Sequence, residues 1–185
     1  LDFLAGQLRR PTGLFGELVV SRLFNHENGP KHDLTLELLE LAPQDRVLEL
    51  GFGGGDLLAR VLERGTAGLV AGGDLSDAMV SHCRRRFAGR LARGRLELAC
   101  AGVESLPHPD ERFDKVYTVN TIYFWDDLDR ALLELRRVLG PGGRLLVTFP
   151  LPASARASHA AVVENLRALG FVRVIDAGRP LHLDE

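Results

Sequence analysis

The sequence predicts one doubly wound α/β domain with a mostly parallel sheet flanked by helices. From about Asp33 onward, strand-like and helix-like segments alternate, which is the pattern of βα units. A chain of 185 residues is long enough for one hydrophobic core and short for two. We therefore expect residues 1–185 to form a single domain, with residues 1–32 as an N-terminal helical cap or lid.

Each expected element rests on a local pattern of residues. Strands are short apolar or alternating runs, and helices carry apolar residues at the 3.6-residue period. Ser76 is a suitable N-cap for the second core helix, and Gly140-Pro141-Gly142-Gly143 is expected to stop the third. In chain order we expect a helix at 14–24, strand 46–50, helix 56–64, strand 69–73, a helix after Ser76 that reaches Phe87, strands 95–100 and 113–119, helix 128–139, strand 144–149, helix 157–169 and strand 171–176.

Composition and charge exclude several classes of function. The net charge is -2, which argues against a dedicated nucleic-acid surface. No apolar run approaches the length of a membrane span. Cys83 and Cys100 lack the spacing of a metal site, so we expect no metal and interpret both as reduced thiols in a cytoplasmic protein. The cluster Arg84-Arg85-Arg86, with Arg90 and Arg93, is interpreted as a solvated helix face.

A glycine-rich turn between the first strand and its helix is the strongest functional signal. Four glycines lie within five positions here: Gly51, Gly53, Gly54 and Gly55. One glycine would suffice for a strand–helix connection that binds no ligand. Glycine costs roughly 0.5–1 kcal/mol of stability relative to alanine in ordered structure, so glycines that serve neither the turn nor a ligand are unfavourable. Without a Cβ, the backbone amides at the carboxyl edge of a parallel sheet are open to a ligand.

The spacing of this turn narrows the class of ligand. A dinucleotide fingerprint that starts at Gly51 requires its third glycine at position 56, which is Asp56 here. A P-loop is excluded because no Gly-Lys-Ser/Thr follows. Glu49 and Asp56 would repel a pyrophosphate and suit a ligand with a cationic end. Asp74, at the end of the second strand, can accept hydrogen bonds from a ribose diol, although by itself it would be interpreted as a solvated turn aspartate.

Five segments in order resemble the motifs of class I S-adenosylmethionine-dependent methyltransferases. The resemblance covers roughly residues 34–174 and is to the small stand-alone type, related to the quinone-biosynthesis methyltransferases. It implies their Rossmann-like fold and S-adenosyl-L-methionine as cofactor. The segments are Val47-Leu48-Glu49-Leu50-Gly51-Phe52-Gly53-Gly54-Gly55, Gly73-Asp74-Leu75-Ser76-Asp77-Ala78-Met79, Glu104-Ser105-Leu106-Pro107 before Phe113-Asp114, Asn120-Thr121-Ile122-Tyr123-Phe124-Trp125, and Arg137-Val138-Leu139-Gly140-Pro141-Gly142-Gly143.

The resemblance also implies roles for residues of the cofactor site. The turn would pack against the methionine part with Glu49 at its amino end, and Asp74 would hold the ribose. Leu75 and Met79 would enclose the adenine, with Val103 and Glu104 along its edge, and Asn120 would lie near the sulfonium. The full expected set is Glu49, Gly51, Phe52, Gly53, Gly55, Asp74, Leu75, Met79, Val103, Glu104 and Asn120.

One position departs from the family pattern. Many relatives carry Gly-Asp-Ala before the Leu-Pro pair, and that aspartate accepts a bond from the adenine amino group. The corresponding stretch here is Ala101-Gly102-Val103, and Gly102 has no side chain for this contact. We expect adenine to be held by backbone groups or by Glu104.

The sequence leaves the acceptor and its chemistry open. Weak candidates for a general base are His26, His32, Tyr123 and Glu17, and each histidine is more often a structural or surface residue. Asn120-Thr121-Ile122-Tyr123 lacks the two prolines of the Asn-Pro-Pro-Tyr motif, which points to a small-molecule acceptor. Tyr123-Phe124-Trp125 would line the acceptor pocket or simply pack against the lid. The oligomeric state stays open.

Two other functions are retained as alternatives. The chain could be a non-catalytic or weakly active module that binds S-adenosylmethionine or S-adenosylhomocysteine, for which Gly102 is the hint. A nicotinamide-dependent oxidoreductase is less favoured because of Asp56. The family usually adds an antiparallel seventh strand. Here it is either very short or absent because the sequence lacks the true C-terminus, and we favour the second.

Overall fold

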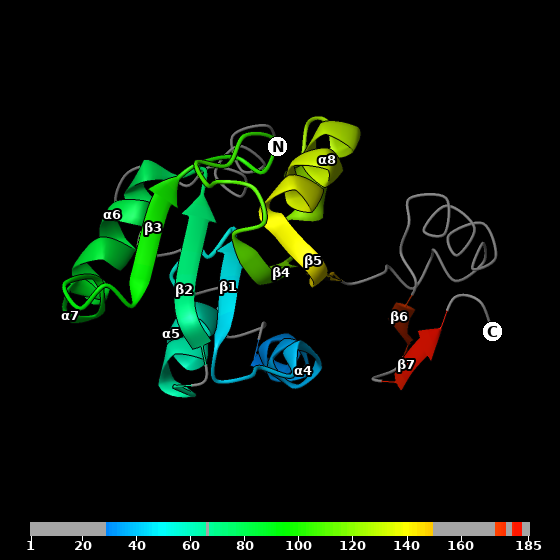
Figure 1. Cartoon of the computed structure of the whole chain (residues 1–185), viewed down its shortest axis with the longest axis horizontal. Helices are drawn as coiled ribbons and strands as arrows, with labels where there is room; N and C mark the ends of the chain where they lie inside the picture. The colour runs from blue at the N-terminus through cyan, green and yellow to red at the C-terminus, as the bar shows by residue number, and fades with distance from the viewer. Residues whose placement is uncertain (1–28, 66, 150–172, 177–178, 183–185) are drawn as a thin grey trace, which may run out of the picture. The chain divides into compact units, whose positions relative to one another are not determined.

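The computed structural model describes residues 29–65, 67–149, 173–176 and 179–182 (Figure 1). The chain divides into two compact units, Leu1–Phe149 and Pro150–Glu185, which are described separately. The predicted helices at 14–24 and 157–169, together with His26 and Glu17, lie outside the described residues. The prediction of a single domain stays a prediction.

A five-stranded parallel sheet forms the centre of the first unit. Its strands are β1 (Asp45–Leu50), β2 (Ala67–Asp74), β3 (Leu96–Cys100), β4 (Phe113–Val119) and β5 (Leu139–Thr148). They lie in the order β3-β2-β1-β4-β5, and each neighbouring pair is parallel (Figure 1). This confirms the predicted doubly wound sheet. The strand order reverses between β1 and β4, and the carboxyl ends next to that reversal are where such sheets bind ligands.

Helices cover both faces of this sheet. They are α4 (Gly29–Leu39), α5 (Asp56–Glu63), α6 (Asp77–Arg86), α7 (Ala88–Leu91), the 3-10 helix η2 (Ile122–Phe124) and α8 (Leu128–Val138). One core cluster joins α4, α5 and α6 to strand residues such as Val47 and Tyr117. The other cluster joins α8 to Leu48 and Val116, which are adjacent in their strands to Val47 and Tyr117. Adjacent strand residues therefore face opposite layers, and full burial of each such apolar side chain contributes about 1.5–3 kcal/mol.

Side-chain caps fix where two of the helices begin. The Ser76 hydroxyl accepts a hydrogen bond from the Met79 amide at 3.4 Å, so the predicted cap of α6 is confirmed. At the start of α8, Asp127 accepts from the Arg130 amide at 3.0 Å. Each cap satisfies one of the amides that the first helical turn leaves without a partner.

Helix α4 corrects the expected layout of the N-terminal segment. No helix was predicted here, and Gly29 and Pro30 form the first turn of this one. Proline is tolerated there because the first amides of a helix have no intrahelical partner. The expected boundary of the cap at residue 32 lies inside α4. Leu36 and Leu39 are buried in the core, so the helix belongs to the first unit.

The glycine segment after α8 also differs from its prediction. The helix stops at Val138, one residue earlier than expected, and β5 begins at once with Leu139. Leu139 pairs with Phe113, and Arg144 pairs with Lys115. The intervening Gly140-Pro141-Gly142-Gly143 therefore forms a bulge opposite the single residue Asp114, and Gly142 has a φ of 73°.

The second unit contains a two-stranded antiparallel sheet of β6 (Arg173–Asp176) and β7 (Arg179–His182). Strand β6 falls within the predicted strand 171–176. A short strand of four residues follows it and pairs with it, outside the five-stranded sheet, and the expectation that the sequence lacks the true C-terminus stays a prediction. Within the described parts of both units, no helix is both long and apolar enough to cross a bilayer.

Candidate cofactor-binding site

The glycine turn leads from β1 into α5 at the carboxyl edge of the sheet. Gly51, Gly53 and Gly55 have φ values of 70°, 51° and 79°, a left-handed conformation that favours glycine. The Gly51 amide donates to the Gly73 carbonyl at 2.7 Å, and the Gly55 amide donates to the Phe52 carbonyl at 2.8 Å. The chain thus turns sharply while it remains bonded to β2.

These glycines serve two different purposes. A Cβ at Gly51 would collide with the side chain of Thr121, and one at Gly55 would lie 2.8 Å from the Cys83 sulfur. Both are required by packing. A Cβ at Gly53 would have no atom of the protein within 4 Å. The open side of Gly53 is therefore where a ligand can approach the backbone.

Residues distant in sequence hold the turn in place. The Gly53 amide donates to Oδ2 of Asp74 at 2.9 Å, and the Cys83 thiol donates to the Gly53 carbonyl at 3.5 Å. Arg86 donates to the Gly54 carbonyl at 2.6 Å and pairs with Asp56 at 2.5 Å. Arg84, Arg85 and Arg86 are exposed, as expected for a solvated helix face, and Arg86 in addition holds the turn.

Asp74 ends β2 with a buried carboxylate that is 8% exposed. Besides the Gly53 amide, it accepts a hydrogen bond from the Ser76 amide at 2.8 Å. Burial raises the pKa of Asp74, and the bonds from Ser76 and Gly53 oppose that rise. Each carboxylate oxygen has two acceptor directions, so Asp74 keeps capacity for ligand hydroxyls.

Glu49 is a second carboxyl group at the same edge, and it is 4% exposed. It stands opposite Tyr117 in the register of β1 and β4, and the tyrosine hydroxyl donates to it at 2.8 Å. Desolvation raises the pKa of Glu49 to about 8, although the bond from Tyr117 partly opposes the rise. Sequence reasoning missed Tyr117, whose only signal was a polar group in a central strand.

Residues expected around adenine separate into exposed and buried groups. Leu75 is 38% exposed, whereas Met79 and Phe52 are buried in the core cluster with α5 and α6. Val103 is buried on the other face of the sheet. Leu75 is therefore open to a ligand, while the side chains of Met79 and Phe52 serve packing, and a cofactor contact from either stays a prediction.

Glu104 lies in the segment between β3 and β4 and is fixed by two contacts. Its Oε1 accepts from the Asp126 amide at 3.0 Å, and its carbonyl accepts from Arg130 Nε at 3.1 Å. Its Oε2 lies 3.1 Å from the point that a Cβ of Gly102 would occupy. The missing side chain at Gly102 thus leaves room for the Glu104 carboxylate.

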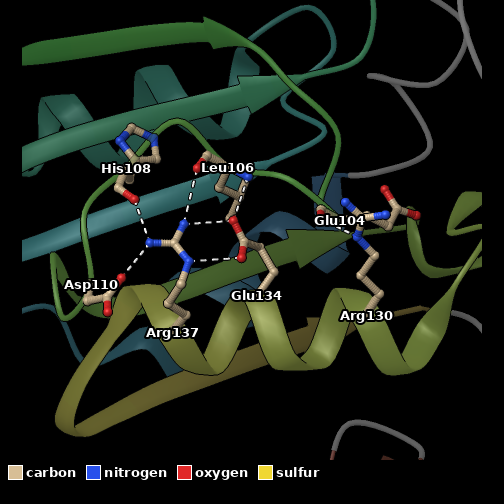
Figure 2. A network of polar contacts seen from close by, with 7 residues as sticks. All are labelled: Glu104, Leu106, His108, Asp110, Arg130, Glu134 and Arg137. Carbon is tan, nitrogen blue, oxygen red and sulfur yellow. Dashed lines mark hydrogen bonds and ion pairs between the residues drawn. The ribbon is translucent and has the colours of Figure 1, made fainter.

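Arg137 of α8 anchors the same segment further along (Figure 2). It donates twice to Glu134, at 2.9 and 2.7 Å, and once to Asp110 at 2.7 Å. The carbonyls of His108 and Leu106 accept from it at 2.7 and 3.1 Å. A guanidinium has five N–H donors, and these five bonds use all of them.

Of the expected catalytic candidates, His32 and Tyr123 lie within the described residues, on two different elements, and the cofactor candidate Asn120 lies close to Tyr123 in the sequence. His32 is buried in α4, where burial and the charge of Arg60 lower its pKa. Tyr123 of η2 is 55% exposed, and its ring contacts Phe124 and Phe149 edge-on. Asn120 follows β4 with a φ of 59°, and its amide donates to the Thr148 carbonyl at 2.8 Å. Among the described residues, no three His, Cys, Asp or Glu side chains gather as a metal site.

Comparison with known proteins decides the family. The sequence profile described as "Methyltransferase domain" matches residues 48–147, more than half of the chain. The chain belongs to this methyltransferase family. This membership identifies the protein as an S-adenosylmethionine-dependent methyltransferase, as the resemblance of the motifs implied, and solved methyltransferases share its fold.

The relatives of this methyltransferase differ in length. The "uncharacterized methyltransferase YdaC" of Bacillus subtilis is 26% identical over 160 residues, 83% of this chain and 86% of that protein. The "ubiquinone/menaquinone biosynthesis C-methyltransferase UbiE" of Teredinibacter turnerae is 38% identical over 114 residues, 61% of this chain. That match spans only 46% of the UbiE protein. A solved "SAM dependent methyltransferase" from Aquifex aeolicus shares the fold, with a TM-score of 0.65 and 18% identity over 86% of this chain and 94% of that one.

The site of the methyltransferase fits its cofactor in chemistry. Gly53 offers an open stretch of backbone, and two carboxyl groups flank the turn. Glu49 suits an ammonium group, and Asp74 suits ribose hydroxyls. The described residues therefore supply carboxyl acceptors suited to the ammonium group and to the ribose hydroxyls of S-adenosylmethionine.

The buried Glu49 carboxyl gives the methyltransferase a pH-dependent stability. Its pKa of about 8 in the folded protein exceeds the ordinary 4.5, so between these values the folded state holds a proton that the unfolded state releases. Wild-type stability should fall as the pH rises from 4.5 to 8. Glu49→Gln keeps an acceptor for Tyr117 and does not titrate. Between pH 4.5 and 8, the free energy of unfolding of the variant relative to wild type should therefore rise by on the order of 4 kcal/mol.

Thermal or urea unfolding at several pH values measures this difference. Glu63→Gln changes an exposed glutamate at the end of α5 and serves as the control. If the Glu49→Gln and wild-type curves run parallel from pH 4.5 to 8, Glu49 does not titrate as described.

Proposed function

We propose that this methyltransferase transfers a methyl group from S-adenosylmethionine to a small-molecule acceptor in the cytoplasm. The turn with its open Gly53, flanked by Glu49 and Asp74, carries the cofactor part of this proposal. The net charge of -2 and the absence of an Asn-Pro-Pro-Tyr motif support a small acceptor over a nucleic acid. The UbiE-named relatives, whose printed name refers to quinone biosynthesis, support the same class.

The residues of the chain would act mainly by binding and alignment. Glu49 would hold the ammonium end of the cofactor, Asp74 its ribose, and Gly53 its methionine part through the backbone. The complete proposed set is Glu49, Gly51, Phe52, Gly53, Gly55, Asp74, Leu75, Met79, Val103, Glu104 and Asn120, with Phe52 and Met79 acting through packing of the turn and α6. The bound sulfonium supplies an already activated methyl group, so correct placement of the acceptor provides much of the rate.

For proton removal from the acceptor, the described residues offer few candidate bases. His32 has a lowered pKa, so its imidazole is neutral at pH 7 and able to accept a proton. Its burial in α4 gives it a packing role as well. Tyr123 is exposed beside the carboxyl edge of β4 and, with Phe124, offers an aromatic surface for the acceptor. We propose Tyr123 as an acceptor-contacting residue and assign no general base.

Isothermal titration with S-adenosylmethionine and S-adenosylhomocysteine tests the cofactor part. We expect both to bind with micromolar dissociation constants, because polar groups for both ends are in place. If Glu49 gives up its proton to hold the ammonium, titrations below pH 8 in buffers of different ionisation enthalpy will report proton release. Absence of binding at millimolar ligand would contradict the proposal, and tighter binding of NADH would favour an oxidoreductase.

A panel of phenolic, quinol and amine acceptors with radiolabelled cofactor tests the catalytic part. Transfer of label to any member supports the proposed reaction class. Cofactor binding without transfer to any acceptor would favour a binding module without catalytic activity, the alternative to which Gly102 points.

A further inference from the structure

We propose that Tyr117 is a positioning residue for the cofactor: its hydroxyl holds the Glu49 carboxyl in the orientation in which that carboxyl receives the ammonium group. This inference rests on the proposed function, in which Glu49 binds the ammonium end. It adds a residue of β4 that would touch no atom of the cofactor and would act through Glu49. Tyr117 is fully buried, and Glu49 is 4% exposed.

The register of the sheet places Tyr117 and Glu49 side by side. Glu49 pairs with Tyr117 of β4 on one side and with Gly72 of β2 on the other. Residues paired in this way point to the same face of the sheet. Gly72 has no side chain, and a Cβ there would lie 2.7 Å from the ring of Phe52. The β2 neighbour of Glu49 therefore offers no polar side chain, and the polar side chain beside Glu49 in this row is Tyr117.

The hydrogen bond between the two residues leaves part of the carboxyl group for a ligand. The Tyr117 hydroxyl donates to Oε2 of Glu49 at 2.8 Å. A hydroxyl has one proton to donate, whereas a carboxylate has two oxygens with two acceptor directions each. The bond restricts rotation of the carboxyl group and keeps acceptor capacity on it. An ammonium group would therefore meet an acceptor that is already oriented, which lowers the entropy lost on binding.

The same bond affects the charge of Glu49. Burial raises the pKa of Glu49 to about 8, and the hydrogen bond from Tyr117 opposes that rise. A hydroxyl donates more strongly to an ionised carboxylate than to a neutral carboxyl group, so the bond favours the charged form. The charged form is the one that attracts an ammonium group. Loss of the hydroxyl should therefore raise the pKa of Glu49 further and make its proton harder to release.

The neighbouring elements do not supply this help. Negative charges on Asp74 of β2 and Asp56 of α5 raise the pKa of Glu49. Cys83 of α6 brings no charge, because burial raises the pKa of its thiol to about 12. His32 of α4 is neutral at pH 7, because burial lowers its pKa. Among the described residues, the tyrosine is thus the group that favours a charged carboxylate here.

Titration calorimetry with S-adenosylhomocysteine and 5′-methylthioadenosine tests the inference. Both compounds carry adenine and ribose, and only the first carries an ammonium group. In Tyr117→Phe, the affinity for S-adenosylhomocysteine at pH 7 should fall by about tenfold, the effect of one charged hydrogen bond, while the affinity for 5′-methylthioadenosine stays unchanged. The pH above which the affinity for S-adenosylhomocysteine stops rising should also move upward from about 8.

Two controls separate positioning from packing. Thr35→Val removes another buried hydroxyl, which is bonded to Thr148, and should leave the pH profile as in wild type. In a Glu49→Gln background, Tyr117→Phe should have little further effect on either ligand, because the group through which it acts no longer titrates.

A fluorinated tyrosine gives a second measurement that keeps the side chain. The chain has two tyrosines, so Tyr117 is the only one left in Tyr123→Phe. Replacing it there by 3-fluorotyrosine makes the hydroxyl a stronger donor, so the pH profile should move to lower pH. If Tyr117→Phe fails to fold, this shift alone decides. Equal weakening of both ligands in Tyr117→Phe, or a pH profile that neither change moves, overturns the inference alone. Failure of wild type to bind S-adenosylhomocysteine overturns the proposed function as well.

Discussion

Replacing Asp74 by alanine should weaken S-adenosylhomocysteine binding by about a hundredfold and also destabilise the fold. The carboxylate accepts hydrogen bonds from the Gly53 and Ser76 amides, so its loss removes the bond that orients the turn. Each buried amide left without a partner costs about 1–3 kcal/mol. Without Asp74, the ligand loses both its ribose partner and the preformed turn. The loss of two charged hydrogen bonds corresponds to about a hundredfold weaker binding.

Calorimetry with S-adenosylhomocysteine, together with urea unfolding, separates the two effects of Asp74→Ala. Asp74→Asn keeps the shape and one acceptor oxygen, so it should retain more stability than alanine while still binding weakly. Asp77→Asn, an exposed change three residues along, is the control and should alter neither quantity by much. If Asp74→Ala bound the ligand as tightly as wild type, Asp74 would have no ribose role.

Replacing Arg137 by alanine should lower the free energy of unfolding by about 3 kcal/mol. Five hydrogen bonds end at this guanidinium, and two of its partners are the carbonyls of Leu106 and His108 (Figure 2). Removal of one member of such a network leaves its polar partners without hydrogen bonds. This is among the larger effects that a single substitution has on stability. Arg136→Ala, an exposed neighbour on α8, should cost well under 1 kcal/mol.

The effect of Arg137→Ala should also depend on pH. The hydrogen bonds from Arg137 lower the pKa of Glu134 to about 2 from its ordinary 4.5. A lowered folded-state pKa contributes stability that is present above 4.5 and is lost as the pH falls towards 2. The difference between wild type and Arg137→Ala in urea unfolding should therefore be constant above pH 4.5 and narrow below it. A difference that grew in acid would contradict the assigned pairing.

Much of the fold could be predicted because its signals are local. The bounds of β4, the Ser76 cap and the glycine turn all follow from residues within a few positions of one another. Helix α4 was missed because Gly29 and Pro30 are typical of loops as well as of a first helical turn. The glycine bulge before Arg144 was missed because it depends on pairing with β4, which the local sequence does not encode.

The candidate site was predictable in position and less so in side-chain direction. Glycine spacing and Asp74 were predicted to meet at one edge of the sheet, and the Gly53 amide is bonded to Asp74 there. Whether a side chain near that edge faces a ligand or the core depends on distant packing, as Phe52 and Met79 illustrate. Tyr117 reaches Glu49 only because β1 and β4 pair across 68 residues of sequence. Pairing between strands so far apart in the sequence leaves no signal in the residues around either strand.

The anchoring of the glycine turn has a consequence for the order of folding. The turn directly follows β1, yet the bonds that orient it come from Asp74, Cys83 and Arg86, which lie 21 to 32 positions further along the chain. Contacts that close long loops form later than local ones, because the loop entropy is lost before the contact is gained. The turn should therefore reach its binding conformation only after β2 and α6 have docked. A partly synthesised chain that ends before Arg86 would carry the complete glycine sequence and still lack the cofactor site.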